Sequence, residues 1–157
     1  MRNKMARPLS RGINHVGLTV PDLHQATEFL KKALDARFVY NGLTDNDPPR
    51  KGTDTERQLG LSPDSMIIRQ RLLRIGNGPN LELFEIVSRE QEQPVRLQDI
   101  GWNHISLYVD DIDYAVERVK AAGGKFLSEI HGNSRHEDTE DNASVYFQTP
   151  WGSLIEL

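Results

Sequence analysis

The sequence predicts an α+β fold built from two βαβββ modules in tandem, and an internal repeat is the main evidence. The segment His15–Leu23 is matched by His104–Ile112, and the match continues without a gap at a separation of 89 residues. A second match joins Leu81–Leu83 to Ile155–Leu157 at a separation of 74 residues. Two matches in the same order indicate that the chain contains a duplication.

The first module begins with a strand and a helix. Residues 13–20 alternate between apolar and polar side chains, which predicts a strand with Val16 on one face and His15 on the other. Asp22 is placed to cap a helix, because apolar residues recur at helical spacing over residues 23–34. The helix must bury its apolar stripe against the sheet, so we expect Val16 to face the helix.

The second module repeats this order. A strand begins at His104, and a helix is expected over Ile112–Ala122, where Gly123-Gly124 ends it. The remaining strands of both modules are expected at residues 38–41, 66–75, 81–87, 125–128, 144–148 and 153–157.

The domain organisation follows from these elements. The modules cover residues 13–90 and 101–157, behind a basic tail over residues 1–12. The two repeat distances differ by 15 residues (89 minus 74), so the first module is the longer one. A polar insertion at about residues 41–65 accounts for this difference, and a loop of this length is often functional.

The strand pattern gathers two histidines and two glutamates on one face of the sheets. His15 and His104 alternate with apolar residues that face the helices, and the two matching Leu/Ile-Glu-Leu segments place Glu82 and Glu156 on the same side. A single histidine on a strand is usually a core residue, but an unpaired buried carboxylate is costly. A cation would offset both carboxylates and give each imidazole a partner. The four residues therefore predict a metal site.

Composition excludes several classes of protein. The 157 residues carry a net charge of -4 and include no cysteine, which excludes disulfide scaffolds, zinc ribbons and cysteine nucleophiles. A metal held by imidazole and carboxylate is Ni, Co, Zn, Mn or Fe. The mild acidity argues against a nucleic-acid partner. No apolar run approaches the roughly 20 residues that span a membrane, and no secretory signal is present, so we expect a cytoplasmic protein without a membrane partner.

These motifs resemble the vicinal oxygen chelate superfamily, also called the glyoxalase/bleomycin-resistance/extradiol-dioxygenase family. The resemblance extends over residues 13–157 and rests on Ile13-Asn-His15-Val-Gly, Leu81-Glu82-Leu83, Trp102-Asn-His104-Ile-Ser and Pro150-Trp-Gly-Ser-Leu-Ile-Glu156-Leu. The last motif differs from the family's usual Asp-Pro-Asp-Gly, because Thr149 and Trp151 replace both aspartates. The resemblance implies a cup-shaped mixed sheet around one divalent ion, with four ligands: His15, Glu82, His104 and Glu156.

The resemblance also implies an activity. A set of four protein ligands resembles that of glyoxalase I, a lyase, and of metal-dependent epimerases, which are isomerases. The ion polarises a carbonyl of a small substrate, and a glutamate moves a proton next to it. Glu156 is the first candidate for this catalytic base, and Glu82 is the second.

Two other functions remain open at this point. An Fe(II)-dependent extradiol dioxygenase uses a triad of two histidines and one carboxylate, which His15, His104 and Glu156 would supply. Glu82 would then be a surplus charge. A non-catalytic binder of the bleomycin-resistance type is the second alternative, although such binders generally lack the metal ligands. In each of these functions the partner of the protein is a small molecule.

The residues that bind the substrate are harder to predict. Arg69 and Arg71 share one face of a strand and are candidates to bind a carboxylate or phosphate, although a solvated strand face is an equal alternative. Phe84 and Tyr108 are candidates to line the pocket. The resemblance also implies a homodimer, in which the cup forms within one chain or from modules of two chains.

Overall fold

The two modules form two four-stranded sheets of the same topology. The computed structural model describes residues 10–157, so most of the predicted basic tail lies outside the described residues. The strand order is β1-β4-β3-β2 in the first sheet and β5-β10-β9-β6 in the second. In each sheet the first strand of the module, β1 or β5, lies at one edge and pairs in parallel with the last strand of that module, β4 or β10. The other strand pairs are antiparallel. The prediction of two βαβββ modules is confirmed.

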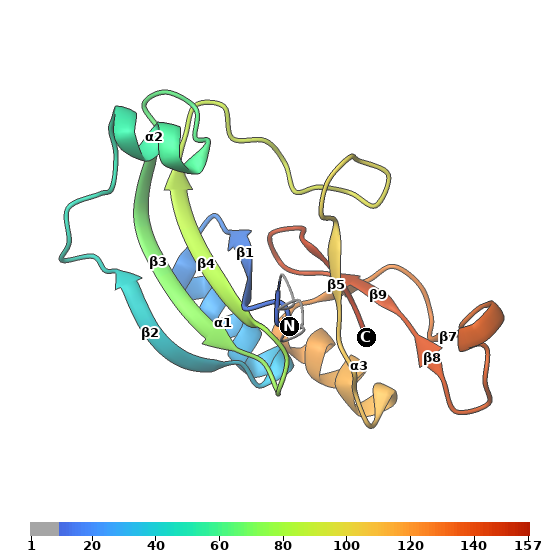
Figure 1. Cartoon of the computed structure of the whole chain (residues 1–157). Helices are drawn as coiled ribbons and strands as arrows, with labels where there is room; N and C mark the ends of the chain where they lie inside the picture. The colour runs from blue at the N-terminus through green and yellow to red at the C-terminus, as the bar shows by residue number, and fades with distance from the viewer. Residues whose placement is uncertain (1–9) are drawn as a thin grey trace, which may run out of the picture.

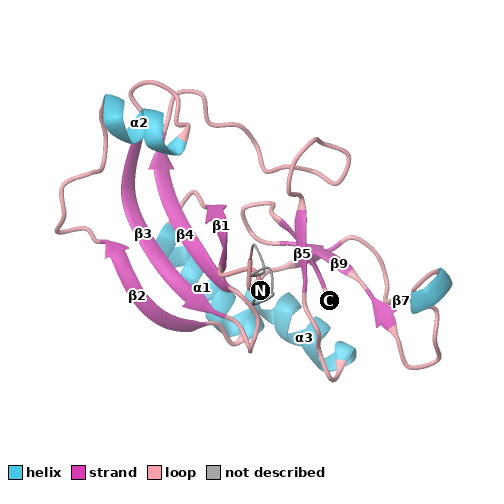
Figure 2. Cartoon of the chain, in the orientation of Figure 1, coloured by secondary structure: helices cyan, strands magenta, loops and turns pink. Residues whose placement is uncertain are grey.

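The elements of the first module are β1 (His15–Thr19), α1 (Leu23–Leu34), β2 (Arg37–Leu43), α2 (Thr53–Leu59), β3 (Met66–Arg74) and β4 (Asn80–Val87). Those of the second are β5 (His104–Ser106), α3 (Ile112–Ala122), β6 (Lys125–Phe126), β7 (His131–Gly132), a 3-10 turn (Arg135–Glu137), β8 (Ala143–Ser144), β9 (Tyr146–Gln148) and β10 (Leu154–Glu156). Strands β7 and β8 form a separate small hairpin. Figure 1 and Figure 2 show the two sheets joined by the long segment between β4 and β5.

Helices α1 and α3 each begin at an aspartate cap, which the sequence predicts for Asp22. The Asp22 side chain accepts a hydrogen bond from the Gln25 backbone N–H at 2.8 Å, and Asp111 accepts one from the Tyr114 N–H at 2.9 Å. Such a cap satisfies a backbone donor that the first turn leaves unpaired. Helix α3 ends at Gly123, whose φ of 103° is a conformation that favours glycine.

The two modules share one hydrophobic core, because α1 and α3 pack against each other. Leu30 of α1 and Val119 of α3 are fully buried in this core together with Leu83 of the first sheet and Phe147 of the second. Trp151 joins the modules as well, since its ring meets Phe29 edge-on with 5.6 Å between ring centroids. The helix-facing sides of both sheets are therefore buried in one core, and the polar sides of the sheets face away from that core.

The polar insertion differs from the expected loop. Strand β2 continues to Leu43, and α2 forms a short helix within the insertion. Helix α2 buries none of its residues, so it has no apolar stripe that a sequence pattern could reveal. Acidic residues in its first turn stabilise it by interacting with the helix dipole. No helix in residues 10–157 is long and apolar enough to cross a membrane.

Candidate metal centre

The first module brings His15 and Glu82 together on the polar face of its sheet. Glu82 on β4 lies opposite Gly17 in the parallel pairing of β1 and β4. Its Oε2 lies 3.2 Å from His15 Nε2. The other oxygen, Oε1, accepts a hydrogen bond from Gln70 Nε2 at 2.6 Å, so one carboxylate oxygen is held by β3 and the other faces the imidazole.

The second module repeats this arrangement with His104 and Glu156. His104 Nε2 lies 3.6 Å from Glu156 Oε2, and both side chains are about three-quarters buried, with 27% and 20% of their surface exposed. Tyr146 on β9 lies directly opposite Glu156 in the antiparallel pairing. Its ring meets the imidazole of His104 edge-on with 5.2 Å between the centroids.

The environment of Tyr146 affects its protonation. Burial raises the pKa of the Tyr146 phenol, and the charge of Glu156 and a hydrogen bond with that carboxylate raise it further. The hydroxyl group therefore keeps its proton at neutral pH and donates it in this hydrogen bond to Glu156. In the first module the position opposite Glu82 is taken by Leu72, which has no polar group.

The donor spacing within each pair suits two ligands of one ion. Two ligands at about 2.1 Å from a metal are about 3.0 Å apart at a right angle and about 3.4 Å apart at a tetrahedral angle. The observed 3.2 Å and 3.6 Å are close to these values. Imidazole with carboxylate is a donor set that Mn, Fe, Co, Ni and Zn accept, and a bound ion would offset the charge of the carboxylate. The residues therefore fit a divalent ion.

The four predicted ligands lie in two pairs and not in one cluster. Among residues 10–157 the structure contains no group of three or more His, Cys, Asp or Glu side chains placed to hold one ion. The common core explains this, because both polar faces point away from it. Each pair is thus a half-site, defined here as His15 with Glu82 or His104 with Glu156.

The predicted substrate-binding residues are dispersed. Phe84 lies on the same face as Glu82, and its ring packs over Gly17, where a Cβ would meet it at 3.8 Å. Tyr108 is fully exposed beyond the end of β5. Arg69 and Arg71 lie on the helix-facing side of β3, away from the His15–Glu82 half-site.

Both arginines are already engaged on that side. Arg69 Nη1 donates to Glu85 at 2.7 Å and its Nε donates to Asp45. Arg71 donates to Asn41 at 2.8 Å and to Thr27 at 2.9 Å. They fix β2, the following loop and α1 to the sheet.

Sequence reasoning missed two residues that contact the half-sites. Gln70 occupies the polar face of β3, and the alternation of that strand would have identified it. Tyr146 was available as a polar side chain on a closing strand, but only the pairing of β9 with β10 places it opposite Glu156.

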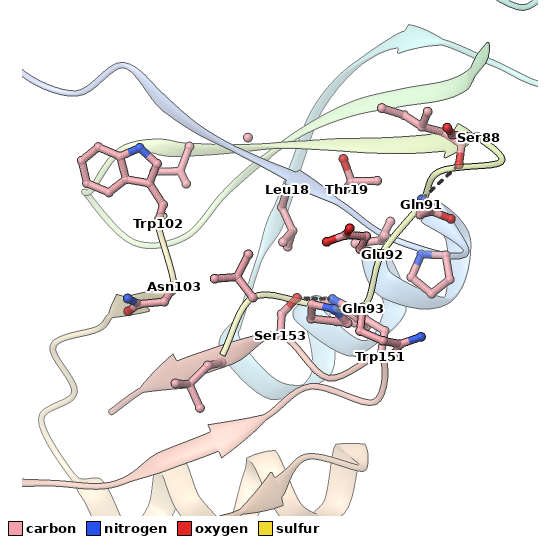
Figure 3. A pocket seen from close by; sticks show the side chains of 18 of the residues that line it. Leu18, Thr19, Ser88, Gln91, Glu92, Gln93, Trp102, Asn103, Trp151 and Ser153 are labelled. Atoms are coloured by element: carbon pink, nitrogen blue, oxygen red, sulfur yellow. Dashed lines mark hydrogen bonds between the residues drawn. The ribbon is translucent and has the colours of Figure 1, made fainter. Parts of the chain in front are cut away.

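A cavity of about 720 Å³ lies between the two modules. Strand β1 lines one side and the start of β5 lines another, while the segment between β4 and β5 covers it. Figure 3 shows Leu18, Gln91, Gln93, Trp102 and Ser153 around this space. Strands β1 and β5 are edge strands, so both of the edges that carry a half-site histidine border this cavity.

The chain belongs to the Glyoxalase/Bleomycin resistance protein/Dioxygenase superfamily, whose sequence profile it matches over residues 14–147. The fold and the paired His–Glu motifs agree with this assignment.

Two relatives are similar in sequence along almost the whole chain. A 2-epi-5-epi-valiolone epimerase from an Actinomyces species is 32% identical over 151 residues, which are 96% of this chain and 80% of the relative. The fosfomycin resistance protein FosX of Listeria innocua is 27% identical over 148 residues, or 93% of this chain and 87% of that protein.

Solved structures share the fold at lower identity. A glyoxalase family protein from Bacillus cereus has a TM-score of 0.72 at 18% identity and covers 98% of this chain and 96% of its own. FosX from Mesorhizobium loti has a TM-score of 0.57 at 23% identity, with 95% and 91% covered. FosX from Listeria monocytogenes, with a TM-score of 0.56 at 19% identity and 95% and 92% covered, has been solved with Mn(II) and sulfate.

Proposed function

We propose that this protein is a divalent-metal-dependent enzyme that epimerises or isomerises a small substrate by proton transfer next to a carbonyl group. The His–Glu pairs carry the proposal, because both modules present an imidazole and a carboxylate at the spacing of metal ligands. The similarity to an epimerase over 96% of the chain supports this class of reaction. His15, Glu82, His104 and Glu156 would hold the ion, and the Mn(II) complex of FosX makes manganese the first metal to test.

A bound divalent ion supplies Lewis acidity, which polarises a carbonyl and makes the neighbouring C–H more acidic. The residues of the chain move the proton. Glu156, the first candidate for the base, takes the proton from carbon and returns it at the position where the product carries it, and Glu82 is the second candidate for this role. Tyr146, whose pKa is raised, keeps its hydroxyl proton and donates it in a hydrogen bond to Glu156, which orients that carboxylate.

We further propose that the two half-sites meet between two copies of the chain. No three of the four predicted ligands lie close enough to hold one ion within residues 10–157, so one chain does not bring the half-sites together. Strands β1 and β5, which carry the histidines, are paired on one side only within residues 10–157. An unpaired edge is a template for association. Ile13 and Trp102, just before these strands, are 70% and 98% exposed, which supports burial against a partner.

Metal analysis tests the ligand set. We expect about one Mn(II) per chain in the purified protein, and the variants Glu82→Ala and His104→Ala should each lose most of it. Glu129→Ala, which removes an exposed glutamate far from both half-sites in the sequence, is the control. Full metal content in both ligand variants would contradict the proposed centre.

Solvent exchange tests the reaction. With Mn(II) in D2O, the protein should incorporate deuterium into 2-epi-5-epi-valiolone at a rate that does not depend on oxygen, and Glu156→Gln should abolish the incorporation. Oxygen uptake with a catechol and Fe(II) would instead establish the dioxygenase. Tight binding of an aromatic antibiotic that a chelator does not change would establish the non-catalytic binder.

A further inference from the structure

The two half-site histidines each follow the same short motif, glycine, an apolar residue and asparagine. These are Gly12-Ile-Asn14-His15 and Gly101-Trp-Asn103-His104, which lie 89 residues apart like the rest of the repeat. Neither asparagine has a role in the centre described above. Their surroundings show what they do.

Each asparagine contacts the ring nitrogen that points away from the glutamate. Asn14 Oδ1 lies 2.7 Å from His15 Nδ1, and Asn103 Oδ1 lies 2.6 Å from His104 Nδ1. An amide oxygen only accepts hydrogen bonds, so Nδ1 must carry the proton in both rings. The lone pair of each neutral imidazole is then on Nε2, the atom that faces the carboxylate.

Each asparagine lies just before the strand that begins at its histidine. Adjacent side chains of a regular strand point to opposite faces, so an asparagine within the strand would not reach the next histidine. Gly12 and Gly101 have φ values of 138° and 139°, a conformation that favours glycine, and they turn the chain just before β1 and β5. The same backbone conformation occurs at both equivalent positions.

The amide of Asn103 is held in place by a second contact. Its Nδ2 donates to the Leu97 carbonyl at 3.5 Å, which turns Oδ1 toward His104. Leu97 belongs to the segment between the modules, so this segment takes part in orienting the second histidine. Asn14 is exposed and has no equivalent side-chain contact among the described residues.

We infer that Asn14 and Asn103 are positioning residues that fix the tautomer and orientation of His15 and His104, so that Nε2 of each ring is presented as a ligand. This inference rests on the proposed metal centre. Partners that orient metal-ligating histidines in this way typically contribute 10-fold to 100-fold to metal affinity, which is the order of effect expected here.

The tautomer is measured on the metal-free protein. In 15N-labelled wild-type protein at alkaline pH, the imidazole nitrogen shifts of His15 and His104 should report Nδ1–H as the major form. Asn14→Ala and Asn103→Ala should each shift their own histidine toward the Nε2–H form, which is the more common one in free imidazole side chains, and leave the other histidine unchanged. Asn14→Asp and Asn103→Asp keep the acceptor and should keep the Nδ1–H form.

Metal affinity is measured on the same set by Mn(II) titration. We expect the alanine variants to bind about 10-fold to 100-fold more weakly and the aspartate variants to recover most of the loss. Asn46→Ala, on an exposed loop, is the control. If both alanine variants fold, keep the Nδ1–H form and bind within twofold of wild type, the inference is wrong. If wild-type protein binds no metal, the proposed centre fails, while the tautomers still test the role of the asparagines.

Discussion

The carboxylate of Glu85 accepts a hydrogen bond from the backbone N–H of Leu23 at 2.9 Å, which ties the first turn of α1 to the middle of the first sheet. Glu85 is only 9% exposed, and its other oxygen receives Arg69 at 2.7 Å. Glu82 faces the opposite side of the sheet, so two glutamates three residues apart lie on different faces, one beside His15 and one beside α1. The contact between Glu85 and Leu23 is the basis of the first prediction.

Glu85→Ala should lower the free energy of unfolding by about 2 kcal/mol, because it leaves a buried backbone donor without a partner. Urea denaturation measures this change. Glu85→Gln keeps an acceptor for Leu23 and should lose less. An unfolding midpoint for Glu85→Ala equal to that of wild type would show that the contact does not stabilise the fold.

The contact between Asp35 and Arg118 joins α1 to α3 and should make stability depend on pH. The hydrogen bond from Arg118, 2.6 Å from the carboxylate, lowers the pKa of Asp35 below its usual 3.8, and the positive charge of Arg118 adds to the effect. A lowered pKa contributes stability above the unfolded value and loses it as pH falls through the folded value. The melting temperature of wild type should therefore fall more steeply below about pH 4 than that of Asp35→Asn.

Asparagine suits this test because Asp35 has a positive φ of 53°, which asparagine also tolerates. The backbone of the C-cap should stay intact while the charge is lost. Equal slopes of melting temperature against pH in the two proteins would exclude a role for the Asp35 charge.

Mixing two defective variants should restore metal binding if the half-sites meet between copies. His15→Ala keeps the second half-site and His104→Ala keeps the first, so a mixed dimer contains one complete site and one that lacks both histidines. After unfolding and refolding together, an equal mixture should bind about one quarter of the metal that wild type binds. A cup closed within one chain predicts no recovery, and the separately refolded variants give the baseline.

Gly42→Ala should weaken metal binding without a large loss of stability. A Cβ at this position would lie 2.9 Å from Cδ and Oε1 of Gln70, so the end of that flexible side chain must move. Gln70 would then release Glu82, whose Oε1 it holds at 2.6 Å. We expect a loss of about 10-fold in Mn(II) affinity, similar to that of Gln70→Leu.

Gly78→Ala is the matched control, because a Cβ there meets nothing within 4 Å. Unchanged affinity in both Gly42→Ala and Gln70→Leu would show that Glu82 does not need this support.

Much of the architecture could be predicted because it depends on local sequence patterns, such as strand alternation and helix caps. Alternation placed His15 and Glu82 on one face of the first sheet, and the structure brings them together. The cap at Asp22 was recognisable from local sequence, and Asp111 takes the equivalent position of the repeat. These features depend on neighbours in sequence or on one strand pairing.

The remaining features depend on contacts between distant segments. The side of β3 on which Arg69 lies follows from its pairing with buried Glu85 on β4, which the pattern of β3 alone does not contain. The separation of the half-sites follows from the packing of α1 on α3. The sequence predicted four residues on equivalent faces but not the directions in which the two faces point.

The pairing of Tyr146 with Glu156, where the first module has Leu72 with Glu82, means that the two halves of the duplication are no longer chemically equivalent. A site made from one half of each kind would present a phenol and a carboxylate to one side of a substrate and a carboxylate beside a hydrocarbon to the other. In the proposed site, this single pair of positions would therefore give the substrate a polar contact on one side and an apolar contact on the other.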